Sequence, residues 1–228
     1  MRNLAVELHI LAFVTNDYMK LLIAGIKGGS NKTTLSINIA AELSATSSVL
    51  ILDTDRQLSS HRWCINRTIL PKIDSRAISS QLDAVVRQEA KNYDNVIIDG
   101  SVRLFDQPQL PTADLMLLPF QISAFSLSTL KIMSDIVKQY SIPALAVLSN
   151  VPTNAGNAAV VECKDFIKNY TKDSLKICNT VIYNRKWYIE SAAIGQGVTE
   201  MSTSKDKSLK NAQAEIRNLL EEIKNYGY

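Results

Sequence analysis

A short glycine-rich segment contains the residues of this chain that are best suited to bind phosphate. It reads Lys27-Gly28-Gly29-Ser30-Asn31-Lys32-Thr33-Thr34. A turn through two glycines can aim successive backbone N–H groups into one concavity, where they hold phosphate oxygens. Lys32 can reach the outer phosphates of a ligand, and the Thr33 hydroxyl can ligate Mg²⁺. The segment therefore predicts a phosphate-binding loop with a metal ligand at its end.

This segment departs from the common phosphate-loop pattern G-x-x-x-x-G-K-[ST] at both glycines. Ile26 stands at the first glycine position and Asn31 at the second. Asn is the non-glycine residue that best tolerates a positive φ angle, so this replacement weakens the prediction without removing it. Lys27 has no required role in an ordinary phosphate loop. A plain polar turn with a solvated lysine is the alternative interpretation.

Two acidic residues, Asp53 and Asp55, close the apolar run at residues 49–52. Because side chains alternate along a strand, both carboxylates are expected to point the same way. Two carboxylates beside a phosphate loop can hold Mg²⁺ and orient an attacking water. The alternative is a helix N-cap followed by a turn aspartate.

A third acid, Asp99, ends the apolar run at residues 95–98 and is followed by Gly100. An acid at this position holds Mg²⁺ through water, and the N–H of the glycine can sense a γ-phosphate. A strand that runs into an ordinary Asp-Gly turn has the same sequence pattern. The loop and the three acids together are much more specific than any one of them.

The elements that must position these residues alternate along the chain. The expected strands cover residues 21–26, 49–53, 73–78, 96–99, 115–119, 144–148 and 176–181, of which 73–78 is the weakest. The expected helices cover residues 32–45, 58–66, 81–91, 127–140, 158–170 and 209–225. Near-continuous Val, Ile and Leu runs are typical of parallel strands that are covered on both faces. The fold predicted is α/β, a doubly wound and mainly parallel sheet with helices on both faces and ligands at the carboxyl ends of the strands.

The composition favours one domain in a reducing compartment. The formal net charge of +3 is too small to require a nucleic-acid partner, but residues 164–228 hold 11 basic and 8 acidic side chains and so contain the whole excess. Cys64, Cys163 and Cys178 form no C-x-x-C pair, which argues against a zinc ribbon. We expect residues 1–18 to be an N-terminal extension and residues 19–228 to be a single domain. The runs of apolar residues are too short to span a bilayer, so we expect a cytoplasmic protein.

These motifs resemble the ParA/MinD family of P-loop ATPases, whose deviant Walker A box reads K-G-G-x-G-K-[ST]-[ST]. The resemblance implies ATP or ADP with Mg²⁺ as cofactors and slow ATP hydrolysis. It also assigns a role to Lys27, the signature lysine that crosses to the partner's nucleotide in an ATP sandwich dimer. Lys32 falls on the phosphate lysine and Thr33 on the Mg²⁺ ligand. The whole box, from Lys27 through Gly28, Gly29, Ser30, Asn31, Lys32 and Thr33 to Thr34, would surround the nucleotide.

The same resemblance implies roles for the acids. The family's D-x-D-P-Q appears as Asp53-Thr54-Asp55-Arg56-Gln57. Asp55 would orient the hydrolytic water, Asp53 would support the metal, and Asp99 would be the Walker B acid. The departures are Asn31 in place of Gly, Arg56 in place of Pro, and Ser126 where relatives often have Asp.

The chain is most similar to the small ParF-like plasmid partition proteins. The spacing R-x-x-Y-x-x-S-x-x-x-G-x-x-V-x-E occurs as Arg185, Tyr188, Ser191, Gly195, Val198 and Glu200. This similarity runs from Met19 to the end of the chain. It implies a DNA segregation ATPase that forms a homodimer on ATP and is stimulated by a centromere-binding adaptor.

The resemblance also implies nonspecific DNA binding and a nucleoid-associated protein. The phosphate contacts would come from basic residues near the C-terminus. The candidates are Arg185, Lys186, Lys205, Lys207, Lys210 and Arg217. The alternative is a solvated helical face, because acidic residues are interspersed among them.

Other functions on the same fold remain open. Membrane binding is not expected, because the apolar positions Ile216, Leu219, Leu220 and Ile223 of the last helix have the pattern of core packing. A positioner of another cargo, such as a conjugation complex, is one alternative to DNA partition. A metabolic ligase is another, although it leaves Lys27 without a role, and an electron-transferring reductase would need paired cluster cysteines.

Overall fold

The computed structural model describes residues 19–107, 109–122, 130–140, 142–172, 175–202 and 205–227. The expected N-terminal extension and Ser126 lie outside the described residues. The helix expected at 127–140 is described from Leu130 onward.

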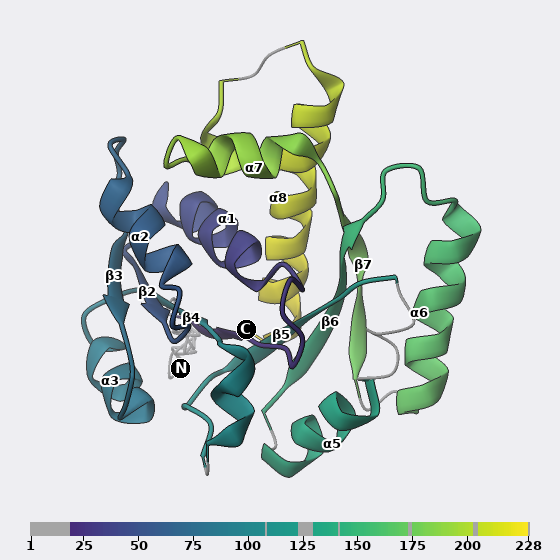
Figure 1. Ribbon diagram of the computed structural model, residues 1–228, viewed down its shortest axis with the longest axis horizontal. Helices are drawn as coiled ribbons and strands as arrows, with labels where there is room; N and C mark the ends of the chain where they lie inside the picture. Colours follow the sequence, from purple (N-terminus) through teal and green to yellow (C-terminus); the bar gives the residue numbers. More distant parts are fainter. Residues whose placement is uncertain are drawn as a thin grey trace, which may run out of the picture.

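A seven-stranded parallel sheet forms the centre of the molecule, in the strand order β3-β2-β4-β1-β5-β6-β7 (Figure 1). The strands are β1 Met19–Ile23, β2 Val49–Asp53, β3 Asp74–Ala77, β4 Asn95–Asp99, β5 Leu115–Phe120, β6 Ala144–Val151 and β7 Lys176–Tyr183. All seven strands expected from the sequence are present, so the α/β prediction is confirmed. Strand β3 gave the weakest signal because it lies at the sheet edge and most of its residues are exposed.

Helices cover both faces of this sheet. They are α1 Lys32–Ser44, α2 Ser59–Asn66, α3 Leu82–Glu89, α5 Leu130–Tyr140, α6 Asn157–Thr171, α7 Lys186–Ala193 and α8 Lys207–Gly227, with the short 3-10 helices η1 Val102–Asp106 and η2 Val198–Glu200. The sequence analysis did not predict α7, η1 or η2. The segments η1 and η2 are only five and three residues long, which is too short for a clear hydrophobic period, and α7 buries only Tyr188 and Ser191.

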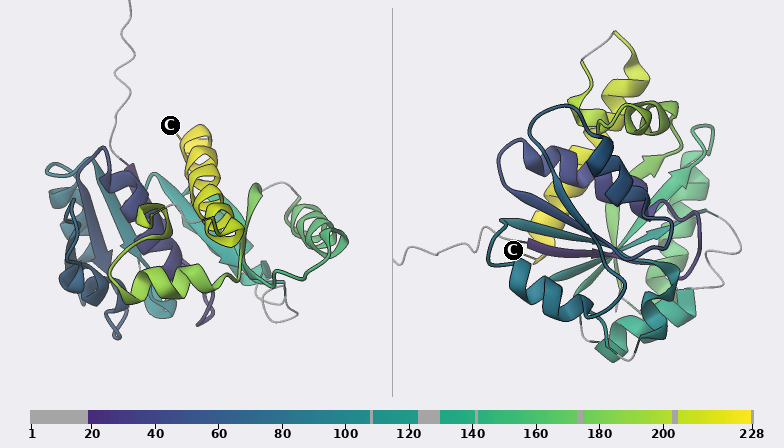
Figure 2. Two further views of the ribbon diagram at one scale, coloured as in Figure 1. Left: turned by 90° about the horizontal axis from the view of Figure 1, so that it is seen from above. Right: turned by 60° about the vertical axis from the view of Figure 1, so that its left-hand side comes forward.

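Alternate residues of the central strand serve two separate cores. Leu21 and Ile23 of β1 pack with α1, α2, α7 and α8, whereas Leu22 packs with α3, α5 and α6 on the other face. Figure 2 shows α8 lying along one face of the sheet. A central strand covered on both faces is expected to be largely apolar, which is why β1 reads as a continuous apolar run from Leu21 to Ile23, after the half-buried Lys20 near its start.

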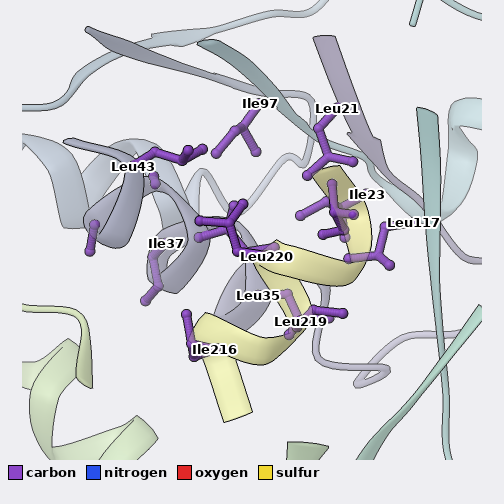
Figure 3. Packing of buried hydrophobic residues seen from close by; sticks show 14 of the residues in the cluster. Leu21, Ile23, Leu35, Ile37, Leu43, Ile97, Leu117, Ile216, Leu219 and Leu220 are labelled. Carbon is purple, nitrogen blue, oxygen red and sulfur yellow. The ribbon is translucent and has the colours of Figure 1, made fainter. Parts of the chain in front are cut away.

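The final helix belongs to the first of these cores. Ile216, Leu219 and Ile223 are fully buried, and Figure 3 shows Leu219 beside Leu35 of α1. The predicted core packing of α8 is therefore confirmed. Within the described parts of the chain, no helix combines the length and the apolar character needed to cross a membrane. The three cysteines are free and buried.

Candidate nucleotide site

The phosphate loop connects the carboxyl end of β1 to the start of α1, at the middle of the sheet. Gly29 and Asn31 both have left-handed backbone conformations, with φ angles of 72° and 74°. Asn31 immediately precedes α1, and its carbonyl accepts the Leu35 N–H at 3.0 Å. The unpaired N–H groups and the positive end of the α1 dipole therefore face the loop, an arrangement suited to an anion.

Lys32 lies inside this loop with only 9 % of its surface exposed. Its Nζ donates to the Lys27 carbonyl at 3.1 Å and to the Ser30 hydroxyl at 3.4 Å. Burial lowers the pKa of Lys32, and the charges of Asp99 and Asp55 partly offset that effect. A buried ammonium group with only neutral oxygens as hydrogen-bond partners would gain strongly from an anionic phosphate.

Thr33 and Asp99 meet at the base of the loop. The Thr33 hydroxyl donates to the Asp99 carboxylate at 2.8 Å. Asp99 is buried at the end of β4, and burial followed by repulsion from Asp53 raises its pKa to about 6. A hydroxyl and a carboxylate oxygen at this separation are a donor set that fits Mg²⁺, whose charge would also relieve the repulsion between the acids.

The Asp53 carboxylate accepts hydrogen bonds from the start of α2. One of its carboxylate oxygens accepts the Asp55 N–H at 2.9 Å, and the other accepts the Ser60 hydroxyl at 2.8 Å and the His61 N–H at 3.0 Å. Ser60 and His61 lie in the first turn of α2, so Asp53 binds the start of that helix from a distance, while Leu58 is its N-cap residue. Asp53 therefore acts on Asp99 through its charge, and its own oxygens accept hydrogen bonds from protein donors.

Asp55 points to the open side of the site. Its carboxylate accepts the Gln57 N–H at 2.9 Å and its charge acts on Lys32. Asp55 and Arg56 line a cavity of about 700 Å³ at the carboxyl ends of β2, β3 and β4. Asp55 is partly exposed beside this cavity, so its carboxylate is accessible to water, as the predicted water-orienting role requires.

Thr54 connects the two acidic strands, and the sequence analysis assigned it no function. Its hydroxyl donates to the Asp99 carbonyl at 3.0 Å and accepts the Ser101 N–H at 2.8 Å. These groups lie at the end of β4 and just after it, far from Thr54 in the sequence. No local pattern could have identified Thr54 as the residue that fixes the spacing of the two loops.

Gly100 has a packing role in this structure. Its N–H donates to the Ile23 carbonyl at 2.9 Å, so the N–H that was predicted to sense a γ-phosphate is used by the sheet. A Cβ atom at position 100 would lie 2.8 Å from the same carbonyl oxygen. Close approach of β1 and β4 is therefore the physical reason for a glycine here.

With the geometry established, comparison with known proteins identifies the family. Residues 21–198 match the family model described as the CobQ/CobB/MinD/ParA nucleotide binding domain. The chain belongs to this ParA/MinD family.

This ParA/MinD protein is also similar to a curated protein over part of its length and to solved structures over most of it. An uncharacterized protein of Borreliella burgdorferi, BBD21, is 46 % identical over 71 residues, a match that spans 29 % of this chain and 28 % of BBD21. The ATP complex of a McdA variant from Cyanothece has a TM-score of 0.66 at 13 % identity, covering 91 % of this chain and 97 % of that one. A plasmid partition protein from Borrelia burgdorferi has a TM-score of 0.56 at 16 % identity, covering 90 % and 99 %. The two structures show that the fold is shared.

The predicted DNA-binding residues of this ParA/MinD protein fall into two groups. Arg185 donates to Glu215 at 2.7 Å with 13 % of its side chain exposed, so it is an internal ion pair and not a phosphate contact. Lys186 lies 3.5 Å from Glu190, and Arg217 lies 3.2 Å from Glu42. The exposed lysines at the start of α8 form the second group, and they are Lys205, Lys207 and Lys210.

The C-terminal sequence motif has a structural explanation. Tyr188 donates to Glu215 at 2.9 Å, joining α7 to α8, while Glu200 pairs with Arg67 at the end of α2. The Val198 N–H donates to the Asn38 side chain at 2.8 Å, joining η2 to α1. The motif residues therefore connect α7 with α8, and they connect the η2 segment with α1 and with the end of α2.

Proposed function

We propose that this protein is a DNA partition ATPase. It would form an ATP sandwich dimer, bind DNA without sequence preference and respond to a centromere-binding adaptor. The observation that supports the proposal is that Lys27 lies in the same folded loop as the buried Lys32. The Lys27 carbonyl accepts the Lys32 ammonium, so the signature lysine and the phosphate lysine belong to one folded loop.

Within one subunit, three residues would hold the nucleotide and its metal. Lys32 and the N–H groups that begin α1 bind phosphate oxygens, and Thr33 and Asp99 take the metal. Mg²⁺ in that position supplies positive charge to the phosphoryl oxygens. The similarity of the fold to an ATP complex of McdA supports ATP as the nucleotide.

Lys27 and Asp55 would make the site catalytic. Lys27 is partly exposed on the loop, so a second subunit can approach it. Charge from a partner's lysine at the transferring phosphate stabilises the transition state. Asp55 orients the water that attacks the γ-phosphate, and the dimer would dissociate after hydrolysis.

DNA binding would use the exposed lysines at the start of α8. Lys205, Lys207 and Lys210 are exposed, whereas Arg185 is internal. Contacts from lysines to phosphates read no sequence and weaken steeply with salt. The similarity to a plasmid partition protein from Borrelia burgdorferi supports a partition function.

ATP turnover with and without nonspecific DNA tests this function. We expect slow, Mg²⁺-dependent hydrolysis that DNA accelerates, and light scattering should detect a dimer with ATP that is absent with ADP. Lys27→Ala should bind ADP normally and lose the dimer, and Asp55→Ala should keep the dimer and hydrolyse more slowly. If DNA does not change the rate of ATP hydrolysis and light scattering detects only monomers with ATP, the protein would instead be a metabolic enzyme.

A further inference from the structure

The residue that breaks the family's loop pattern makes a contact that glycine could not make. The Asn31 side-chain amide donates to the Ser149 hydroxyl at 3.0 Å. Ser149 lies near the end of β6 and is fully buried. Asn31 thus ties the phosphate loop to a strand that is separated from β1 by the whole of β5 (Figure 1).

Both ends of this hydrogen bond are held in place. Asn31 has a φ of 74°, and its side chain makes no cap hydrogen bond to α1, so the amide is directed away from the helix. Ser149 follows Val147 by two positions and therefore shares its face, which packs in the core beside α1. The pairing of β6 with β7 shifts register on both sides of Leu148, and Asn150 has a φ of 56°, so β6 departs from regular strand geometry around the serine.

We infer that Asn31 is a positioning residue that holds the phosphate loop in its nucleotide-binding shape through Ser149. The inference rests on the proposed nucleotide site. Residue 31 directly precedes Lys32, so fixing its side chain also fixes the direction of the Lys32 N–H and the start of α1. A glycine at this position could adopt the same φ but would leave the loop free to move away from β6.

This contact should slow the release of bound nucleotide. A loop that is ordered before binding loses less conformational freedom when the phosphates arrive. Losing one neutral hydrogen bond that orders the loop should accelerate release by about two- to tenfold. Loss of this hydrogen bond should change the melting temperature little, because many other contacts hold the sheet and α1 together.

The experiment measures release of a fluorescent ADP analogue by stopped-flow chase, in the presence of Mg²⁺, for three variants of the full chain. Ser149→Ala removes the acceptor and leaves the backbone of the loop unchanged. Asn31→Gly removes the donor and restores the family residue, and the third variant combines both changes. Ser44→Ala is the matched control, because Ser44 is also a buried serine but its hydroxyl bonds within α1, to the Ala41 carbonyl.

Each single variant should release the analogue faster than wild type by about two- to tenfold, and the double variant should be no faster than the faster single one. Ser44→Ala should release at the wild-type rate even if its melting temperature falls. Wild-type release from Ser149→Ala, or additive effects in the double variant, would refute the inference while leaving the nucleotide site intact. No binding of the analogue to wild type, or equal binding to Lys32→Ala, would refute the proposed site itself.

Discussion

The buried pair Asp53 and Asp99 predicts that the ionised Asp99 carboxylate makes the nucleotide-free protein less stable at neutral pH. Asp53 and Asp99 are paired in register on adjacent strands, and both are almost fully buried. Burial, followed by the charge of Asp53, raises the pKa of Asp99 to about 6 from its ordinary value of 3.8. Replacing Asp99 with Asn removes the charge and keeps an oxygen that can accept the Thr33 hydroxyl.

The sign follows from proton linkage. Asp99 is protonated in both the folded and the unfolded chain below pH 3.8, so its charge then has no effect on stability. As the pH rises from 3.8 to about 6, the unfolded chain ionises first and the wild-type protein loses stability. A shift of about two units corresponds to about 3 kcal/mol, which is the upper limit of the gain for Asp99→Asn above about pH 7.

The assay is urea unfolding of both proteins in EDTA, without nucleotide, from about pH 4 to about pH 8. The difference in the free energy of unfolding between Asp99→Asn and wild type should be small at the acid end of this range and grow to about 2–3 kcal/mol at the alkaline end. Asp94→Asn is a control of opposite sign, because hydrogen bonds from the Ser48 backbone and hydroxyl lower the pKa of Asp94. A difference for Asp99→Asn that does not change with pH, or a variant less stable than wild type at the alkaline end, would refute the reasoning.

Three further variants test the loop, the sheet and the C-terminal ion pair. Lys32→Ala should abolish ADP binding in calorimetry without lowering the melting temperature of the nucleotide-free protein, because burial already disfavours the Lys32 charge. Gly100→Ala should lower the free energy of unfolding by about 1–3 kcal/mol in urea denaturation, since its Cβ would lie 2.8 Å from the Ile23 carbonyl. Arg185→Ala should lower the free energy of unfolding by about 3 kcal/mol in the same assay, because it leaves the buried Glu215 carboxylate without its cationic partner. It should not change the salt dependence of DNA binding.

Matched changes separate these effects from general damage. Lys72 is exposed and distant in sequence from the loop, so Lys72→Ala should bind ADP like wild type. Lys186→Ala removes an exposed cation next to Arg185 and should leave the unfolding free energy nearly unchanged. Unchanged ADP affinity in Lys32→Ala, or a weaker salt dependence of DNA binding in Arg185→Ala, would contradict the corresponding assignment.

Local sequence patterns were sufficient for the fold and for the residues that surround the phosphate site. A continuous apolar strand, a glycine turn and a lysine followed by threonine are neighbours along the chain, so their geometry is set by a few backbone angles. Parallel strands then bring Asp53 and Asp99 to the same edge of the sheet as the loop. The sequence displays the alternation of side chains and the acid at the end of each strand, and the parallel arrangement then brings those ends together.

The tertiary structure alone decided what each polar group is bonded to. Asp53 accepts hydrogen bonds from the first turn of α2, and Gly100 donates its N–H to β1, although the sequence suggested a metal and a phosphate as their partners. Arg185 has the charge of a DNA contact but is paired inside the molecule with Glu215. In the sequence, Asn31 is a departure from the glycine of the family's loop pattern, and only the structure shows that its side chain donates to Ser149 of β6. Such pairings depend on contacts between residues far apart in the chain, and a buried donor or acceptor takes the partner that packing brings within reach.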